Sequence, residues 1–336
     1  MSDHVGIGFV GCGGMARAHA DAIKDISGAK IVGVTDASPE AATAFCSAHS
    51  GALVFDSPEE LAASADVDCL FLLLPPFAHG DAERAAIKHK KPFFIEKPVG
   101  LDKHLLNTLS REVQESGLMT CAGYMNRYRR SVNTAKEMLA NDPPHLAYGA
   151  WFGGARAGLG TSGIGLWWLV KEKSGGQFHE QVTHTVDLAR YLFGEAKVVS
   201  AFAANGFNKP YPGVTADDAM VVNIQFESGA VANLMGSIAS NAKGGVFLTV
   251  LAKDHAFEFT GWENSVIIHR KGEEEGGVIK GEDNIFRIED QIFLDAVRSG
   301  DGSAIRSTYP DAAKTALLTV AANESIAAGG QPIKLS

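Results

Sequence analysis

The sequence lacks several features that would place it in other protein classes. Of 336 residues only four are cysteine, and they form no Cys-x-x-Cys pair and no metal-ligand spacing. This usage is typical of reduced thiols rather than a disulfide framework or a zinc site. The longest apolar run, Cys69–Pro76, is far shorter than the roughly 18 residues of a membrane span.

The chain also lacks an excess of basic residues, and its start does not have the pattern expected of a signal peptide. It has 30 Lys and Arg against 39 Asp and Glu, a net charge of -9. An acidic chain without a basic cluster argues against nucleic-acid or anionic-membrane partners. Asp3 and His4 stand where a signal peptide carries Lys or Arg, and glycines interrupt the apolar start, so we expect a cytoplasmic protein.

The first third alternates strand-like and helix-like segments, which predicts a parallel sheet covered by helices on both faces. At about 150 residues per domain the length suggests two domains, and we place them at 1–124 and 125–336. Strands are expected at Val5–Val10, Lys30–Thr35, Cys69–Leu74, Pro92–Ile95 and Leu118–Ala122. Helices are expected at Met15–Ile26, Pro39–His49, Pro58–Ala65, His79–His89 and Leu101–Ser116, with Ser38 and Asp102 as N-caps.

Beyond residue 145 the strands follow one another with short turns, which predicts an open, mostly antiparallel sheet flanked by helices. These strands are expected at His145–Phe152, Lys197–Ala204, Ala219–Glu227, Ala230–Ile238, Val246–Ala252, Ala256–Phe259 and Ser265–His269. Helices are expected at Ser131–Ala140, Gln177–Phe193, Ile285–Arg298 and Pro310–Ala328. A Gly-rich segment, Gly153–Gly176, is too long for an ordinary turn and is either functional or disordered.

A glycine-rich motif follows the first strand. Gly11-Cys12-Gly13-Gly14-Met15-Ala16 has the spacing G-x-G-x-x-A, which allows a tight turn, a close approach to a pyrophosphate, and a helix N-terminus facing it. Asp36 ends the second strand twenty residues after Ala16, where a carboxylate accepts hydrogen bonds from both ribose hydroxyls. No Arg follows it to neutralise a 2′-phosphate, which favours NAD over NADP. The alternative is a Gly-rich turn with an unrelated aspartate.

Two further motifs stand at strand ends, where open α/β sheets bind ligands. Leu74-Pro75-Pro76 and His79 stand at the end of the predicted strand Cys69–Leu74, as a cofactor contact or as a rigid turn with a surface histidine. Glu96-Lys97-Pro98 follows the next strand, and the proline holds Lys97 extended at the sheet edge. A partly desolvated lysine can polarise an alcohol or carbonyl oxygen. The alternative is a solvated strand end.

A histidine cluster lies in the second half. If Gln177–Phe193 is helical, Glu180, His184 and Asp187 stand at i, i+4 and i+7 on one face. Histidine suits proton transfer near neutral pH, and a neighbouring carboxylate can orient it. His179 and His184 are five residues apart, which is not the spacing of a two-histidine zinc site, and no metal is expected. The alternative is a surface Glu–His pair.

These motifs, in this order, resemble the glucose–fructose oxidoreductase/inositol 2-dehydrogenase (Gfo/Idh/MocA) family over nearly the whole chain. The resemblance implies an N-terminal Rossmann domain and a C-terminal sheet that often forms an oligomer interface, here of a homodimer or homotetramer. It implies oxidation or reduction of a carbinol carbon of a sugar or polyol with a nicotinamide cofactor. Lys97 matches the lysine that contacts substrate and cofactor, and His184 the usual acid/base. Glu180 stands where the family often has Asp, and Val182 where it often has Gly.

The resulting hypothesis is an NAD-dependent dehydrogenase acting on a secondary hydroxyl of a carbohydrate-like molecule. His184 exchanges the proton, Lys97 polarises the oxygen, Glu180 orients His184 or binds a second hydroxyl, and Asp187 has a structural role. The expected substrate-contacting residues further include Tyr124, Arg156, Trp167 and Trp168, and the expected cofactor contacts further include Glu96. The rival functions are a non-catalytic NAD-binding regulator and a metal-dependent sugar isomerase or lyase.

Overall fold

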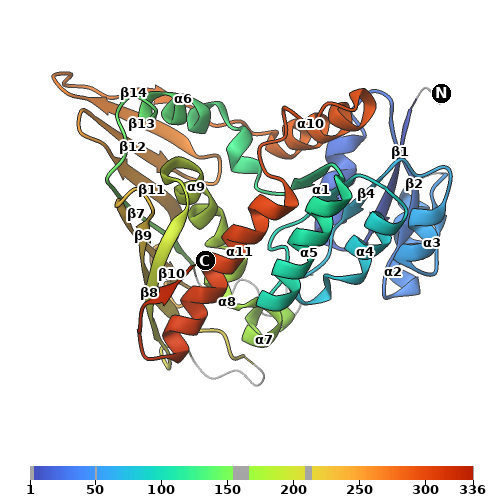
Figure 1. Ribbon diagram of the computed structural model, residues 1–336, viewed down its shortest axis with the longest axis horizontal. Coiled ribbons are helices and arrows are strands. Elements are labelled where there is room, and N and C mark those ends of the chain that lie inside the picture. The colour runs from blue at the N-terminus through green and yellow to red at the C-terminus, as the bar shows by residue number, and fades with distance from the viewer. Residues whose placement is uncertain (1–3, 50, 154–165, 209–213, 336) are drawn as a thin grey trace. The chain divides into compact units, whose positions relative to one another are not determined.

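The chain folds into two compact units, seen here in a computed structural model that describes residues 4–49, 51–153, 166–208 and 214–335 (Figure 1). The first unit extends to Met125 and also contains Asn284–Ala313, and the second holds Asn126–Asp283 and the chain from Lys314 onward. The first boundary lies one residue from the expected one. The predicted second domain is wrong for residues 284–313, because their helix packs on the first sheet through Phe293, whose ring lies 5.6 Å from that of Phe71.

The first unit is built on a six-stranded parallel sheet in the order β3-β2-β1-β4-β5-β6. Its strands are β1 (Val5–Val10), β2 (Ala29–Thr35), β3 (Leu53–Val54), β4 (Cys69–Leu72), β5 (Phe93–Ile95) and β6 (Thr120–Ala122). Its helices are α1 (Gly14–Ile23), α2 (Pro39–Ala48), α3 (Pro58–Ala63), α4 (Asp81–Lys88), α5 (Lys103–Ser116) and α10 (Ile285–Ser299). This strand order is that of the Rossmann fold, so the predicted class is confirmed.

Local sequence signals account for much of this unit. The Ser38 hydroxyl accepts a hydrogen bond from the Ala41 N–H at 3.2 Å, and Asp102 accepts one from the Leu105 N–H at 2.7 Å. Both predicted N-caps are therefore confirmed, with Pro39 at the first turn of α2. All four residues of β4 are buried, as expected of a strand covered on both faces.

The second unit is built on a nine-stranded sheet in the order β14-β13-β12-β11-β7-β10-β9-β8-β15. Its strands are β7 (Leu146–Phe152), β8 (Ala196–Ala204), β9 (Ala219–Phe226), β10 (Val231–Ser237), β11 (Gly245–Leu251), β12 (His255–Thr260), β13 (Ser265–Arg270), β14 (Gly277–Ile279) and β15 (Ile333–Lys334). Neighbouring strands are antiparallel except β7 and β10, which pair in parallel. The predicted open, mostly antiparallel sheet is confirmed, whereas β14 and β15 were not predicted.

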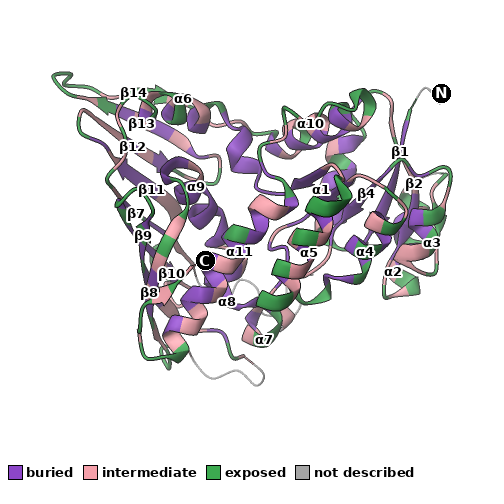
Figure 2. Cartoon of the chain, in the orientation of Figure 1, coloured by how far each residue is buried: buried purple, intermediate pink, exposed green. Residues whose placement is uncertain are grey.

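Helices lie against one face of this sheet (Figure 1). They are α6 (Arg130–Leu139), α7 (Lys171–Ser174), α8 (Gly176–Glu180), α9 (Thr183–Phe193) and α11 (Tyr309–Ala327), which begins in the first unit. Buried side chains of α6, α8, α9 and α11 form one core with those of the strands (Figure 2). The described part of the chain contains no helix that is both long enough and apolar enough to cross a membrane.

The expected continuous helix Gln177–Phe193 is interrupted, and this prediction was wrong. The Val182 N–H donates to the Gln177 carbonyl at 3.0 Å, and the next turn restarts with the Thr185 N–H on the Val182 carbonyl at 2.8 Å. The turn packs closely on β10, since a Cβ at Gly236 would lie 3.1 Å from a Val182 methyl. Glu180 and His184 therefore belong to different helices, and the shared-face argument fails.

Candidate active site

The predicted cofactor residues of the first unit follow the carboxyl ends of its parallel strands. Gly11 follows β1, Asp36 follows β2, Leu74 follows β4 by two residues, and Glu96 follows β5. Tyr124 follows β6 by two residues. Because the strands are parallel, these positions meet at one edge of the sheet. The strand order turns there between β1 and β4, which is where such sheets bind dinucleotides.

The glycine-rich turn has the space that a pyrophosphate needs. Gly11 has a φ of 97°, and a Cβ there would lie 2.5 Å from the Leu73 carbonyl oxygen, so only glycine fits. A Cβ at Gly13 or Gly14 would meet no atom within 4 Å. Helix α1 begins at Gly14 without a side-chain cap, which leaves its first N–H groups to bind an anion. The turn from Gly11 to Met15 therefore fits the phosphates of a dinucleotide.

Asp36 lies directly beside this turn. One carboxylate oxygen accepts the Cys12 N–H at 2.7 Å, and the other accepts the Ser38 N–H at 2.8 Å. A carboxylate has about four lone-pair sites, so acceptor capacity remains for ribose hydroxyls. The Cys12 thiol is buried, and burial, with Asp36 and Cys46 nearby, raises its pKa to about 12. The thiol therefore stays neutral, and Cys12 offers a ligand its main chain.

His79 has a different environment from the expected one. Leu74 and Pro75 lead into a 3-10 turn at Pro76–Ala78, after which the His79 ring is buried against Glu83, with Nδ1 and Oε1 2.8 Å apart. Glu83 also accepts the Gly80 N–H at 2.7 Å. Burial alone would raise the pKa of Glu83. The charge and hydrogen bond of His79, together with the main-chain N–H groups of Gly80 and Glu83, outweigh burial and lower that pKa. The ring holds the start of α4, so a cofactor contact of its side chain is not supported.

Lys97 is half-buried at the end of β5, and its peptide bond to Pro98 is cis. The Lys97 N–H donates to Glu96 Oε2 at 3.1 Å. Glu96 Oε1 lies 3.0 Å from His19 Nε2, and His19 Nδ1 lies 2.9 Å from Asp290. The Glu96 carboxylate, expected to contact the cofactor, thus fixes the chain at Lys97. Sequence reasoning missed His19 and Asp290, which lie far from Glu96 along the chain.

In the second unit, His184 packs beside two indole rings that also contact each other. Its ring centre is 6.2 Å from that of Trp151 and 5.9 Å from that of Trp262, and the two indoles are 5.8 Å apart. These residues line a cavity of about 10 Å³ together with Asn126 and Asn264, which is room for roughly one water. Trp262 is 46% exposed. The sequence suggested Trp167 and Trp168 as pocket residues and missed these two, although Trp151 stands near the end of a predicted strand.

The predicted residues of the Gly-rich segment are only partly described. Its end folds into a 3-10 turn, Leu166–Leu169, which carries the half-buried Trp167 and Trp168. The Trp168 indole N–H donates to Glu180. Arg156 lies outside the described residues. The Tyr124 side chain, a predicted substrate contact, is buried in the first unit.

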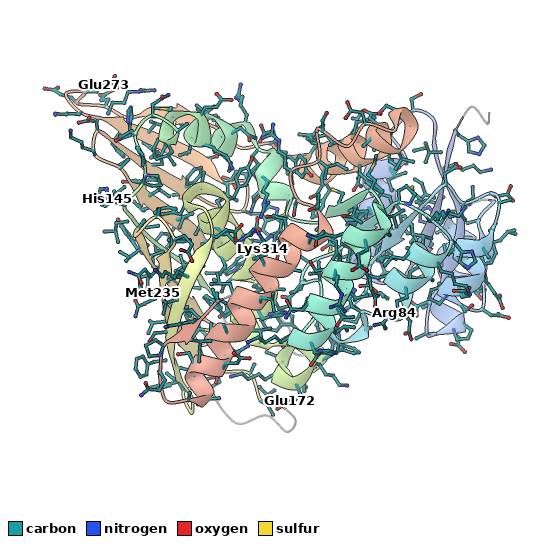
Figure 3. The ribbon with its side chains drawn as sticks, viewed as in Figure 1. Arg84, His145, Glu172, Met235, Glu273 and Lys314 are labelled. Atoms are coloured by element: carbon teal, nitrogen blue, oxygen red, sulfur yellow. The ribbon has the colours of Figure 1, made fainter. Side chains whose placement is uncertain are left out.

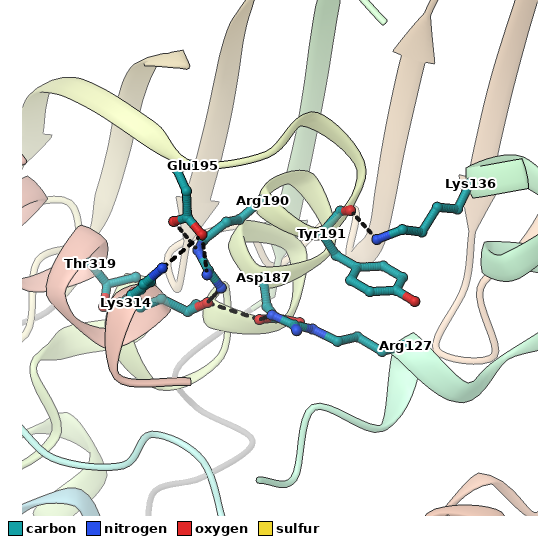
Figure 4. Close-up of polar contacts among 9 residues, drawn as sticks. Arg127, Lys136, Asp187, Arg190, Tyr191, Glu195, Lys314 and Thr319 are labelled. Carbon is teal, nitrogen blue, oxygen red and sulfur yellow. Dashed lines mark hydrogen bonds and ion pairs between the residues drawn. The ribbon is translucent and has the colours of Figure 1, made fainter. Parts of the chain in front are cut away.

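Asp187 is part of a buried ionic network (Figure 4). Its carboxylate takes two hydrogen bonds from Arg127, from Nε at 2.8 Å and from Nη2 at 2.5 Å, and both side chains are at most 3% exposed. The Thr315 hydroxyl donates to the same carboxylate at 2.9 Å. Arg190 continues the network to Thr315 and Glu195. The expected structural role of Asp187 agrees with these contacts.

Removing the charge of Asp187 is expected to destabilise the second unit. Asp187→Asn leaves the buried Arg127 guanidinium without its anion, which should lower the free energy of unfolding by about 3–5 kcal/mol. Thr315→Val removes one neutral donor and should cost about 1 kcal/mol. Urea unfolding of both variants at pH 7 measures the difference. Equal losses in the two variants would show that the ion pair adds nothing beyond a hydrogen bond.

No metal cluster accompanies these groups among residues 4–49, 51–153, 166–208 and 214–335: no three His, Cys, Asp or Glu side chains are placed to hold one ion.

Two models of one protein family match the sequence. Residues 5–124 match "Oxidoreductase family, NAD-binding Rossmann fold", and residues 150–266 match "GFO/IDH/MocA C-terminal domain". The chain is 26% identical over 248 residues to the inositol 2-dehydrogenase of Rhizobium meliloti (strain 1021), covering 69% of this chain and 68% of that one. It is 25% identical over 270 residues to the scyllo-inositol 2-dehydrogenase (NAD(+)) of Bacillus subtilis (strain 168), covering 76% and 77%.

Among solved structures, a levoglucosan dehydrogenase in complex with NADH and L-sorbose superposes with a TM-score of 0.86 at 17% identity, covering the whole of both chains. At this identity the likeness shows the fold alone. The two family models together span most of the chain, the first over the N-terminal Rossmann unit and the second over much of the other unit. The chain therefore belongs to the Gfo/Idh/MocA family of oxidoreductases, with an N-terminal NAD-binding Rossmann domain.

Proposed function

We propose that the protein is an NAD-dependent dehydrogenase that oxidises a secondary hydroxyl of a sugar, polyol or related carbohydrate. The observation that carries this proposal is the sheet edge of the first unit. The open glycine-rich turn, Asp36 and Lys97 all follow carboxyl ends of parallel strands there. Relatives named as inositol dehydrogenases support the substrate class.

The residues divide the chemistry between them. Bound NAD supplies the hydride acceptor, the main-chain N–H groups of the glycine-rich turn hold its phosphates, and Asp36 holds a ribose. In this proposal His184 accepts the hydroxyl proton and Lys97 donates a hydrogen bond to the same oxygen, which lowers the cost of its developing negative charge. The Glu180 carboxylate, which already accepts from Trp168, binds a second hydroxyl.

The direct test is a panel of sugars, polyols and anhydrosugars, with NADH formation measured by absorbance. We expect turnover with at least one cyclic polyol or sugar. NADH binding without turnover on any compound would favour a regulatory protein instead. Turnover that a chelator abolishes, without NADH formation, would favour the metal-dependent isomerase or lyase.

Cofactor preference provides a second test. The Asp36 carboxylate repels a 2′-phosphate, so kcat/KM should be higher with NAD than with NADP. Asp36→Ala with Ala37→Arg should narrow that gap, because it removes the repulsion and adds a cation. Asp36→Asn is the matched control, since it removes the charge without adding a cation, and its single amide oxygen can still accept from one of the Cys12 and Ser38 N–H groups. Equal or better use of NADP by the unmodified protein would contradict the assignment.

We also propose that the outer face of the nine-stranded sheet joins two copies of the chain. Phe202, Val221, Met235, Ala150 and Phe247 lie opposite one another in one row across β8, β9, β10, β7 and β11. Phe202 is 56% exposed and Val221 41%. On the same face, two positions away along each strand in either direction, lie two further rows of paired residues. Neither row contains a charged residue on these five strands. A second copy offers the same uncharged face, as a two-fold interface requires.

If this interface forms, a substitution that disrupts it should lower the mass of the protein's assembly in solution. The unmodified protein should run as a dimer or tetramer in sedimentation, and Met235→Glu, on this face (Figure 3), should shift it toward the monomer. A buried, unpaired carboxylate would oppose association. Glu273→Gln, in the exposed β13–β14 loop, is the control. A monomeric unmodified protein, or a Met235→Glu variant of unchanged mass, would contradict the interface.

A further inference from the structure

Three ionisable side chains form a buried chain of hydrogen bonds in the first unit. His19 Nε2 lies 3.0 Å from Glu96 Oε1, and His19 Nδ1 lies 2.9 Å and 3.0 Å from the two oxygens of Asp290. His19 and Asp290 are fully buried and Glu96 is 4% exposed. Burying three such groups together is costly unless each is well paired. The proposed chemistry uses neither His19 nor Asp290.

The three residues come from separate elements. His19 lies on α1, the helix that opens at the glycine-rich turn, whereas Glu96 follows β5. Asp290 lies on α10, which enters the first unit only after the chain has completed most of the second. The network therefore ties the cofactor-binding helix to the segment that carries Lys97.

Aromatic rings hold the imidazole in one orientation. Its centre is 4.9 Å from the ring of Phe94, 5.7 Å from Phe71 and 5.6 Å from Phe286, all in edge-on contacts of 62° to 75°. A ring held on three sides cannot rotate away from its two carboxylates.

The charge state follows from these contacts. Burial alone would lower the pKa of His19, but the charges and hydrogen bonds of Asp290 and Glu96 outweigh it and raise the pKa to about 10. An imidazolium has two N–H donors, and each faces a carboxylate here. These contacts therefore favour the charged form of His19 at neutral pH.

The network affects the position of Lys97 through the Glu96 carboxylate. With Oε1 held by His19, Glu96 Oε2 accepts the Lys97 N–H at 3.1 Å. The carboxylate also packs against Gly123, where a Cβ would lie 3.0 Å from Oε1. The position of the Glu96 carboxylate thus determines the position of the Lys97 main chain.

We propose that His19 and Asp290 are positioning residues for Lys97: they fix the Glu96 carboxylate, which fixes the main chain from which the lysine side chain extends. This inference rests on the proposed function only where Lys97 is said to act on substrate. The placement of the lysine itself is a property of the first unit and can be measured without a substrate.

The test compares His19→Gln and Asp290→Asn with Leu109→Ala, a buried core variant of α5 that removes packing without touching the network. Thermal unfolding verifies that the variants are folded and that their melting temperatures fall comparably. The first readout is the rate at which an acetylating reagent modifies the Lys97 amine, resolved by mass spectrometry over a range of pH. The second is kcat on a substrate from the panel, and the third is NADH affinity by fluorescence.

We expect His19→Gln to change the Lys97 modification rate at least threefold and to lower kcat at least tenfold, with NADH affinity within threefold. Asp290→Asn keeps an acceptor oxygen and should show a smaller loss. Leu109→Ala should leave all three readouts unchanged. If His19→Gln matches Leu109→Ala in modification rate and kcat while Lys97→Ala is inactive, the positioning role is overturned and the proposed function stands. If Lys97→Ala is fully active, Lys97 has no chemical role on the substrate, and if no panel compound is turned over, the proposed function fails. In both cases the modification rate alone decides the positioning role.

Discussion

Replacing His184 by Ala is expected to lower kcat for alcohol oxidation by about 10²–10⁴-fold, the usual contribution of a general base. The imidazole accepts the hydroxyl proton as hydride leaves, and alanine cannot. In the unmodified protein kcat should also fall with decreasing pH, because a protonated imidazole cannot accept the hydroxyl proton. His184→Ala should abolish most of the activity and should also remove this fall of kcat at low pH, which we call the acid limb.

The measurement is kcat against pH for three variants. Glu180→Gln keeps the shape of the side chain but removes its charge, so some activity should survive and the fall of kcat at low pH should remain. His145→Ala removes an exposed histidine at the start of the same sheet (Figure 3) and should leave both rate and limb unchanged. A His184→Ala variant that keeps rate and limb would refute the assignment and leave Lys97 as the remaining candidate base.

Lys97→Ala is expected to reduce turnover by orders of magnitude while NADH binding persists. The cofactor contacts expected of the glycine-rich turn and Asp36 do not depend on the Lys97 side chain, so affinity should change little. Turnover should fall because the developing charge on the substrate oxygen loses its donor, and loss of one such donor typically costs about 10²–10³-fold.

NADH fluorescence titration and steady-state rates separate the two effects. Lys24→Ala serves as the matched control, because it removes an exposed lysine directly after α1 whose amine lies 2.8 Å from Asp21 Oδ1 on the surface. Near-normal turnover of Lys97→Ala would make Lys97 a strand-end residue without a chemical role. Loss of NADH binding in Lys97→Ala would instead show that Lys97 maintains the structure or binds the cofactor.

The interrupted helix shows a limit of predicting helices from hydrophobic periodicity. The spacing of apolar residues predicts one amphipathic helix over Gln177–Phe193. That spacing carries no information about the turn that the segment makes where it packs on β10. The Gln177 side chain bonds the carbonyls of Trp151 and Ser237, at the ends of β7 and β10, and so anchors α8 there. Glu180 consequently meets Trp168, while Asp187 meets Arg127, sixty residues away in sequence.

Features that depend on a few neighbouring residues could be predicted before the structure was known. Local sterics, hydrogen bonding and hydrophobic period account for the glycine-rich turn, the caps at Ser38 and Asp102, the strand ends carrying Asp36 and Lys97, and the class of both sheets. The surroundings of the reactive groups could not be predicted in this way: the indoles beside His184, the Glu96–His19–Asp290 chain behind Lys97, and the assignment of α10 to the first unit. These contacts join residues tens to hundreds of positions apart, and their free energy comes from packing and burial that no local pattern records.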